Sequence, residues 1–214
     1  MPTQKVIART LLDRQGTSYA ERAGIRLKDT PSPLYRLLVL SLLLSARISA
    51  DIAVAAAKEL SKAGYRTPKA MTAATWQDRV DALGRGHYRR YDERTATMLG
   101  DGAEQLLDEY GGDLRRLRES AVDQDELEER LQRFPGIGPA GAAIFCREVQ
   151  AVWTDLWPYV DAKAEKGAKA IGLPSSARRL ARLVDRPDLP RLLAGCIDVA
   201  NSRRAADEVR AAAR

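Results

Sequence analysis

Glycine and proline divide this chain into short segments, and this punctuation limits the possible fold more than any other feature of the sequence. The breaks lie at 31–33, 84–86, 111–112, 135–139 and 172–174. Between them alanine, leucine, arginine and glutamate dominate, which favour helices, whereas β-branched and aromatic residues are sparse. The sequence therefore predicts an all-α protein of about ten short helices.

Length and composition indicate a globular chain. Its 214 residues, 45% hydrophobic and 30% charged, suffice for one domain or two small lobes around a buried core. The net charge of +6 favours an anionic partner such as nucleic acid, but only weakly, because acidic and basic residues are interleaved along the chain.

Several classes of site are excluded by what the sequence lacks. It has two cysteines without a Cys-x-x-Cys pair, which leaves no zinc ribbon and no iron–sulfur ligand set. Its single histidine, His87, leaves no His-based metal site and no Ser-His-Asp triad. The apolar run 37–44 is shorter than the roughly 20 residues of a membrane helix and predicts a buried core helix. With no secretory pattern, we expect a cytoplasmic protein without membrane contact.

A glycine-rich hairpin joins two predicted helices at 135–139. The first helix places Leu127, Leu131 and Phe134 at i, i+4 and i+7 on one apolar stripe. It should end at Pro135, whose ring cannot continue it, and the second helix should begin near Pro139.

The hairpin has the composition of a phosphate-binding turn. Gly136 and Gly138 can adopt positive φ and let a ligand approach the backbone closely. The N–H groups at the start of the second helix, around Ala140, would then face an anion such as a DNA phosphate. Ile137 would anchor the turn inward. Taken alone, the motif is equally consistent with a plain tight turn between helices.

Four stretches, in this order, resemble the helix-hairpin-helix DNA glycosylase superfamily of endonuclease III and the adenine glycosylases. They are Leu43-Leu44-Ser45-Ala46-Arg47, Gly86-His87-Tyr88 followed by Ala96, the hairpin 131–142, and Tyr159-Val160-Asp161. The order is more specific than any single motif. The resemblance covers roughly residues 30 to 175. It implies an all-α, two-lobed fold with a DNA-binding groove between the lobes.

The resemblance also suggests how the chain is divided. We expect residues 28–152 to form a helical, barrel-like lobe that ends in the hairpin. Residues 1–27 and 153–214 should form the second helical lobe, which contains Asp161. We expect a monomer.

The activity implied by the resemblance is base excision. Such an enzyme flips a damaged or mispaired base out of the duplex and hydrolyses its N-glycosidic bond. A carboxylate near the anomeric carbon can stabilise the positive charge that develops on the sugar and orient a water molecule. Asp161 is the predicted catalytic residue. Its structural alternative is the N-cap of a helix over 162–170.

The resemblance assigns DNA contacts to two further regions. Arg47 and His87 stand at positions that probe the opposite strand. The loop 84–94 interleaves basic and aromatic residues, as suits phosphate contact and stacking, although a solvated turn is the alternative. The predicted DNA-binding residues are Arg47, His87, Tyr88 and Arg89, together with Gly136, Ile137, Gly138 and Ala140.

Departures from the family pattern define the alternatives. Ala140 stands where bifunctional members have their lysine, and the iron–sulfur cysteines are missing. The leading prediction is therefore a monofunctional DNA glycosylase acting on double-stranded DNA, without a metal or organic cofactor. By resemblance, hairpin carbonyls would accommodate a monovalent cation. The alternatives are a non-catalytic protein that binds DNA structure and a bifunctional glycosylase/lyase using a displaced lysine, Lys163 or Lys166. Adenine mispairs, alkylated purines and oxidised pyrimidines all remain candidate substrates.

Overall fold

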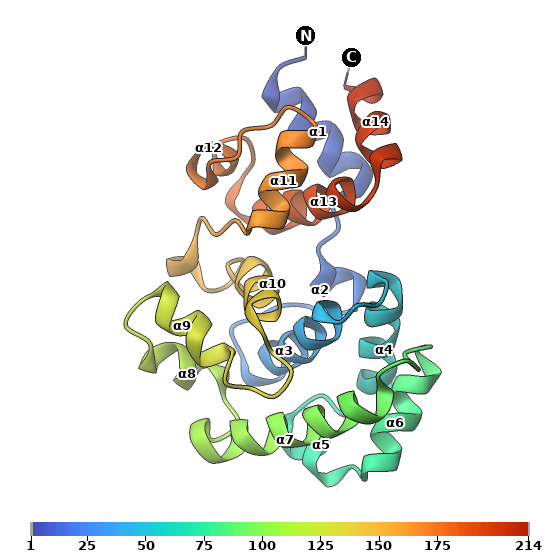
Figure 1. Ribbon diagram of the computed structural model, residues 1–214. Helices are drawn as coiled ribbons and strands as arrows, with labels where there is room; N and C mark the ends of the chain where they lie inside the picture. Colours follow the sequence, from blue (N-terminus) through green and yellow to red (C-terminus); the bar gives the residue numbers. More distant parts are fainter. Residues whose placement is uncertain (1, 214) are drawn as a thin grey trace. The chain divides into compact units, whose positions relative to one another are not determined.

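The structure, a computed structural model, describes residues 2–213, and every regular element in that range is a helix (Figure 1). The all-α prediction is confirmed. Those residues form fourteen α-helices, more than the roughly ten expected. Additional breaks are made by polar N-caps without a glycine, such as Ser49 accepting from Ile52 N and Thr75 accepting from Asp78 N.

The chain divides into two compact units, which are described separately. Unit 1 comprises Met1–Tyr19 and Gln150–Arg214, and unit 2 comprises Ala20–Val149. Unit 2 begins at residue 20, whereas the predicted boundary is at 28, and it ends at 149, close to the predicted boundary at 152. The Ala20 N–H donates to the buried carboxylate of Glu148 at 2.9 Å, which ties this segment to the end of the hairpin's second helix.

Unit 2 is built around one buried helix, α3 (Pro31–Ser45), which packs against α4 (Ala50–Lys62) and α10 (Pro139–Val149). Seven of its residues from Leu37 to Leu43 are buried, and the hydroxyl of the buried Ser41 donates to the Leu37 carbonyl at 2.9 Å. Among the residues described, no helix has the length and apolar character needed to cross a membrane. The remaining helices of unit 2 are α2 (Tyr19–Arg22, begun in unit 1), α5 (Pro68–Ala73), α6 (Trp76–Arg85), α7 (Asp92–Tyr110), α8 (Leu114–Ser120) and α9 (Gln124–Leu131).

A single arginine joins three helices of unit 2. The Arg79 guanidinium donates to the carbonyl oxygens of Met71 at 3.0 Å, Ala74 at 2.9 Å and Ala96 at 2.9 Å. Because these carbonyls belong to α5, the turn after it and α7, the contacts fix α6 between its neighbours. The loop that follows α6 is thereby held in place from both sides.

Unit 1 is centred on the buried helix α13 (Leu189–Asn201), with α1 (Gln4–Gln15) and α11 (Ala162–Ala170) against it. Gly167 of α11 lies directly on the backbone of α13, since a Cβ there would sit 1.8 Å from the Cys196 carbonyl oxygen. No residue other than glycine fits this contact. Unit 1 also contains η1 (Thr154–Leu156), α12 (Ala177–Ala181), η2 (Arg186–Asp188) and α14 (Arg203–Ala212).

Candidate nucleic-acid interface

The second helix of the hairpin begins where the sequence predicts, whereas the first ends four residues before the predicted end at Pro135. Helix α9 ends at Leu131 and α10 begins at Pro139. Gly136 has φ of +81°, in the left-handed region, and a Cβ there would lie 2.7 Å from the Met98 sulfur. Ile137 is buried, with 4% of its surface exposed, and its N–H donates to the Phe134 carbonyl at 3.0 Å. The inward anchor is thus confirmed.

Gly138 has a different role from Gly136. Its φ is outside the left-handed region, because the residue before a proline favours extended backbone, and a Cβ there would meet nothing within 4 Å. Of the two glycines, only Gly136 uses positive φ. Gly138 instead leaves open space beside the start of α10, so a ligand can reach the backbone there.

The start of α10 presents unbonded amides. The Ala142 N–H makes the first α-helical bond, to the Gly138 carbonyl at 3.0 Å, so the N–H groups of Ala140 and Gly141 precede the helical ladder. Ala140 is exposed. A Cβ on the buried Gly141 would lie 3.6 Å from the Ser45 Cβ, which shows how closely α10 approaches α3. This geometry suits an anion at the helix start.

The loop after α6 holds a histidine in a glycine-like conformation. His87 has φ of +63°, and among the described residues it is the one non-glycine residue with positive φ. The Tyr88 N–H donates to the Leu83 carbonyl and the His87 N–H to the Gly84 carbonyl, each at 3.0 Å. This is the Schellman ending of a helix, in which the left-handed residue is most often glycine. The imidazole of His87 is exposed.

A pocket of about 270 Å³ lies in unit 2 where three of the predicted motifs meet. Arg47 comes from the turn after α3, Tyr88 from the loop after α6, and Gly136 from the hairpin. Tyr88 is buried, and burial raises the pKa of its hydroxyl above the ordinary value. The other lining residues are Leu42, Ser45, Ala46, Tyr91, Arg94, Thr95 and Met98. His87 and Arg89 flank Tyr88, are exposed and do not line this pocket.

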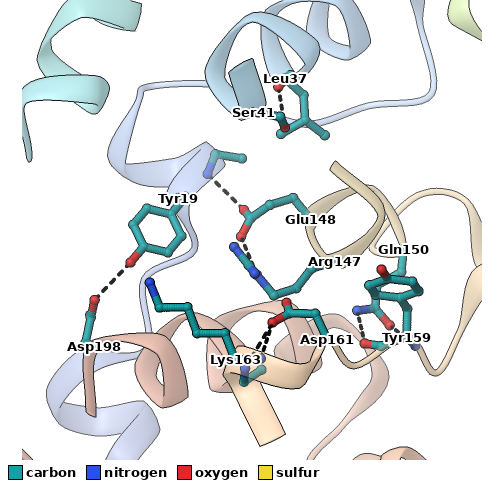
Figure 2. A network of polar contacts seen from close by, with 12 residues as sticks. Tyr19, Leu37, Ser41, Arg147, Glu148, Gln150, Tyr159, Asp161, Lys163 and Asp198 are labelled. Carbon is teal, nitrogen blue, oxygen red and sulfur yellow. Dashed lines mark hydrogen bonds and ion pairs between the residues drawn. The ribbon is translucent and has the colours of Figure 1, made fainter. Parts of the chain in front are cut away.

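Asp161 caps a helix in unit 1 (Figure 2). Asp161 is the residue immediately before α11. Its Oδ1 accepts from the backbone N–H of Lys163 at 2.9 Å and of Ala164 at 3.0 Å. The predicted N-cap role is therefore correct. The side chain is half-buried, and a carboxylate that accepts two backbone bonds is held in one orientation.

Gln150 positions the segment before Asp161. Its Nε2 donates to the Tyr159 carbonyl at 2.8 Å, and its Oε1 accepts from the Tyr159 N–H at 3.0 Å (Figure 2). Both groups of the buried amide are thus bonded to one residue, two positions before Asp161. Sequence reasoning missed Gln150, since a glutamine after a helix has no distinctive pattern. Arg94, the last residue of the loop 84–94 singled out in the sequence, lies in the first turn of α7 and lines the pocket.

The two lysines considered as an alternative nucleophile, in place of one at position 140, lie on α11. Lys163 and Lys166 are both exposed and stand three residues apart on that helix. Ala140 itself has no amine. Within unit 2, the structure therefore brings Arg47, Tyr88 and Gly136 together, while Asp161 and both lysines belong to unit 1.

Comparisons with known proteins find similarity in structure only. No protein-family model matches the chain, and no curated protein matches its sequence. Two solved complexes of endonuclease III with DNA are similar at 20% identity, with 92% of this chain and 85% of theirs covered. One is a trapped covalent intermediate, an estranged-adenine complex, with a TM-score of 0.47, and the other is a non-covalent complex with a TM-score of 0.48.

Proposed function

We propose that this protein is a monofunctional DNA glycosylase that removes a damaged or mispaired base by hydrolysis. The observation that supports it most is the hairpin. A left-handed Gly136, the buried anchor Ile137 and the open space at Gly138 leave the first amides of α10 accessible to a phosphate. Since phosphates carry no sequence information, such a contact positions the duplex without selecting its sequence.

Asp161 supplies the chemistry in this proposal. Two backbone amides fix one carboxylate oxygen, and Gln150 fixes the segment before it. An ionised carboxylate held in this way can stabilise the positive charge that develops on the sugar as the glycosidic bond breaks. It can also orient the water that attacks the anomeric carbon. Asp161 is thus both a structural cap and the proposed catalytic residue.

Hydrolysis is favoured over lyase chemistry because the hairpin lacks an amine. A Schiff base needs an unprotonated amine beside the sugar carbon, which enzymes obtain by desolvating a lysine. Ala140 offers none, and Lys163 and Lys166 are exposed to water. The proposed product is therefore an intact abasic site.

The hairpin could also accommodate a monovalent cation beside the phosphate. The Phe134 and Gly138 carbonyl oxygens each accept one N–H, from Ile137 and Ala142, and each retains a second lone pair. Such an ion would offset phosphate charge when bound. The hydrolysis at Asp161 does not depend on it.

One observation favours a second candidate, a protein that binds DNA structure without cleaving it. The Asp161 carboxylate already has a structural role as a helix cap, which is reason enough for an aspartate at this position. In that case the hairpin and the loop after α6 would bind DNA, and no base would be released.

A panel of labelled duplexes, each with one lesion or mismatch, separates these candidates. Strand cutting that appears only after alkali treatment supports a monofunctional glycosylase. Cutting without alkali indicates a lyase. Retarded gel mobility without any cutting, across adenine mispairs, alkylated purines and oxidised pyrimidines, supports the binding protein and contradicts the proposed activity.

A further inference from the structure

We propose that unit 1 contains a binding site for a ribonucleoside di- or triphosphate, in a pocket of about 860 Å³ between α1 and the segment from Arg182 to Arg191. All the residues that line this pocket belong to unit 1, and Asp161 is not one of them. The proposal is therefore independent of the proposed glycosylase function, and it adds a ligand other than DNA.

The net positive charge of the protein belongs to unit 1. Residues 1–19 and 150–214 contain fifteen basic and nine acidic side chains, whereas residues 20–149 contain twenty of each. Such a surplus of cations creates a positive potential that attracts anions. Seven of the ten residues that line the pocket are charged, and four of these are basic. The pocket therefore suits a strongly polar ligand with negative charge.

Helix α1 contributes two cations to the pocket from positions that do not stabilise the helix. Lys5 and Arg9 stand at i and i+4, so their like charges repel each other on one helix face. Lys5 is also in the first turn of α1, where the helix dipole disfavours a cation. The two charges oppose each other and, at Lys5, the dipole, and an anion in the pocket would relieve both effects.

Three of the four basic side chains in the pocket are available to a ligand. Arg191 is already held, since its guanidinium donates to the Asp188 carboxylate at 2.7 Å. The side chains of Lys5, Arg9 and Arg182 are exposed, and within residues 2–213 they form neither a hydrogen bond nor an ion pair. A di- or triphosphate concentrates several negative charges in one short chain, and lysine and arginine both bind phosphate well. A peptide would need three acidic side chains to supply as many partners.

A carboxylate in the same pocket indicates what else the ligand offers. Asp13 follows Arg9 by four residues on α1, yet it is exposed, and the described part of the chain provides no partner for its side chain. An ionised carboxylate only accepts hydrogen bonds, so the ligand needs a donor beside its phosphates. A ribose 2′-hydroxyl is such a donor, and acidic side chains bind it in nucleotide sites. Leu12 and Val184, both half-buried, supply apolar surface for the base.

The DNA backbone is the other source of phosphate, and it fits this pocket less well. Deoxyribose has no 2′-hydroxyl, and within a strand its 3′-oxygen is esterified, so the backbone offers no donor to Asp13. The volume of about 860 Å³ also lies within the roughly 300–1,000 Å³ of small-molecule sites. A free ribonucleotide satisfies the three cations and the carboxylate together.

Isothermal titration calorimetry of the full chain with each of the four ribonucleoside triphosphates tests the site, at about 0.15 M salt to screen general attraction. At least one of them should bind with one nucleotide per chain. The matching 2′-deoxynucleotide should bind about ten-fold more weakly, the scale of one hydrogen bond to a charged group, and tripolyphosphate more weakly still. Arg9→Gln and Arg182→Gln should each weaken binding by about ten-fold. Asp13→Ala should remove the preference for ribose.

Arg14→Gln serves as the matched control. Arg14 is an exposed cation of α1 that does not line the pocket, so its loss lowers the net charge equally but should leave nucleotide affinity unchanged. Binding of none of the four nucleotides, equal affinity for ribo- and deoxynucleotide, or an equal loss in Arg14→Gln would overturn this inference. Displacement of the nucleotide by undamaged duplex, with weaker duplex binding in Arg9→Gln, would assign the pocket to the DNA backbone instead. Base release by Asp161 is measured separately and is unaffected by any of these results.

Discussion

The backbone N–H of Tyr88 donates to the carbonyl oxygen of Leu83 at 3.0 Å, across a left-handed His87. Glycine is the usual residue at this position of a Schellman ending, because a side chain there costs about 1 kcal/mol or more. A histidine therefore strains the loop that the resemblance assigns to DNA contact. The strain is consistent with a side chain retained for binding.

His87→Gly should separate stability from function. We expect its free energy of unfolding to rise by about 1 kcal/mol, because the strain is relieved, while affinity for lesion-containing duplex falls. Urea denaturation and anisotropy measure the two effects. His87→Ala, which keeps a Cβ, should lose affinity without gaining stability. A destabilised His87→Gly variant would show that the backbone conformation is not strained.

The two hairpin glycines should respond differently to substitution. Gly138→Val meets open space, and the φ of this residue is outside the left-handed region, so the protein should fold normally but bind all duplexes more weakly, since the side chain blocks the phosphate. Gly136→Ala should instead destabilise unit 2, because of its φ of +81° and the Met98 sulfur at 2.7 Å from a Cβ. Circular dichroism and anisotropy distinguish the outcomes. If folded Gly138→Val bound duplexes with full affinity, the hairpin would be only a turn between helices and not a phosphate-binding site.

Local sequence signals predicted the elements of the site, and tertiary contacts account for what they missed. Pro139 marks the start of α10 and Asp161 is a preferred cap, whereas α9 ends at Leu131, four residues before Pro135. The two hydrogen bonds between Gln150 and Tyr159 join residues nine positions apart, and they depend on how the chain turns after α10. Arg94 joins Arg47 only through the packing of unit 2, which no single segment encodes.

The two cysteines should be unreactive in the folded protein. Both are free and buried, and burial raises the pKa of both thiols. The pKa of Cys196 rises to about 12, mainly through burial and to a smaller extent through the Asp161 carboxylate. Alkylation at pH 8 should therefore require denaturation. Rapid alkylation of either thiol in the native protein would contradict the buried placement.

The same pKa shifts predict a loss of stability in alkali. The folded thiol of Cys196 holds its proton to a higher pH than the unfolded one. Its contribution to the free energy of unfolding is therefore complete below about pH 8.5 and declines as pH rises towards about 12. The urea midpoint should fall over that range. Cys196→Ala should show a shallower decline, and an unchanged slope would assign the loss to other groups.

Borohydride should trap no covalent adduct between this protein and damaged DNA. Ala140 has no amine, and the exposed Lys163 and Lys166 lack the desolvation that a Schiff-base lysine needs. Denaturing gels of the reduced mixture would reveal an adduct as a shifted band. Such a band that vanished in Lys163→Ala or Lys166→Ala would establish the bifunctional alternative.

The central claim is that Asp161 performs the hydrolysis, and Asp161→Asn tests it most directly. Asparagine is as good an N-cap as aspartate, so the amides of Lys163 and Ala164 keep their acceptor and the fold should be unchanged. The substitution thus removes the negative charge while it keeps the helix cap. Asp185→Asn, an exposed carboxylate of the same unit, is the control.

The measurement is single-turnover base release from the lesion that the parent protein excises. The account predicts that Asp161→Asn binds this duplex as the parent does and releases the base at least about 10²-fold more slowly, while Asp185→Asn matches the parent. Release by Asp161→Asn at the parent's rate, or no excision by the parent of any lesion in the panel, would contradict it.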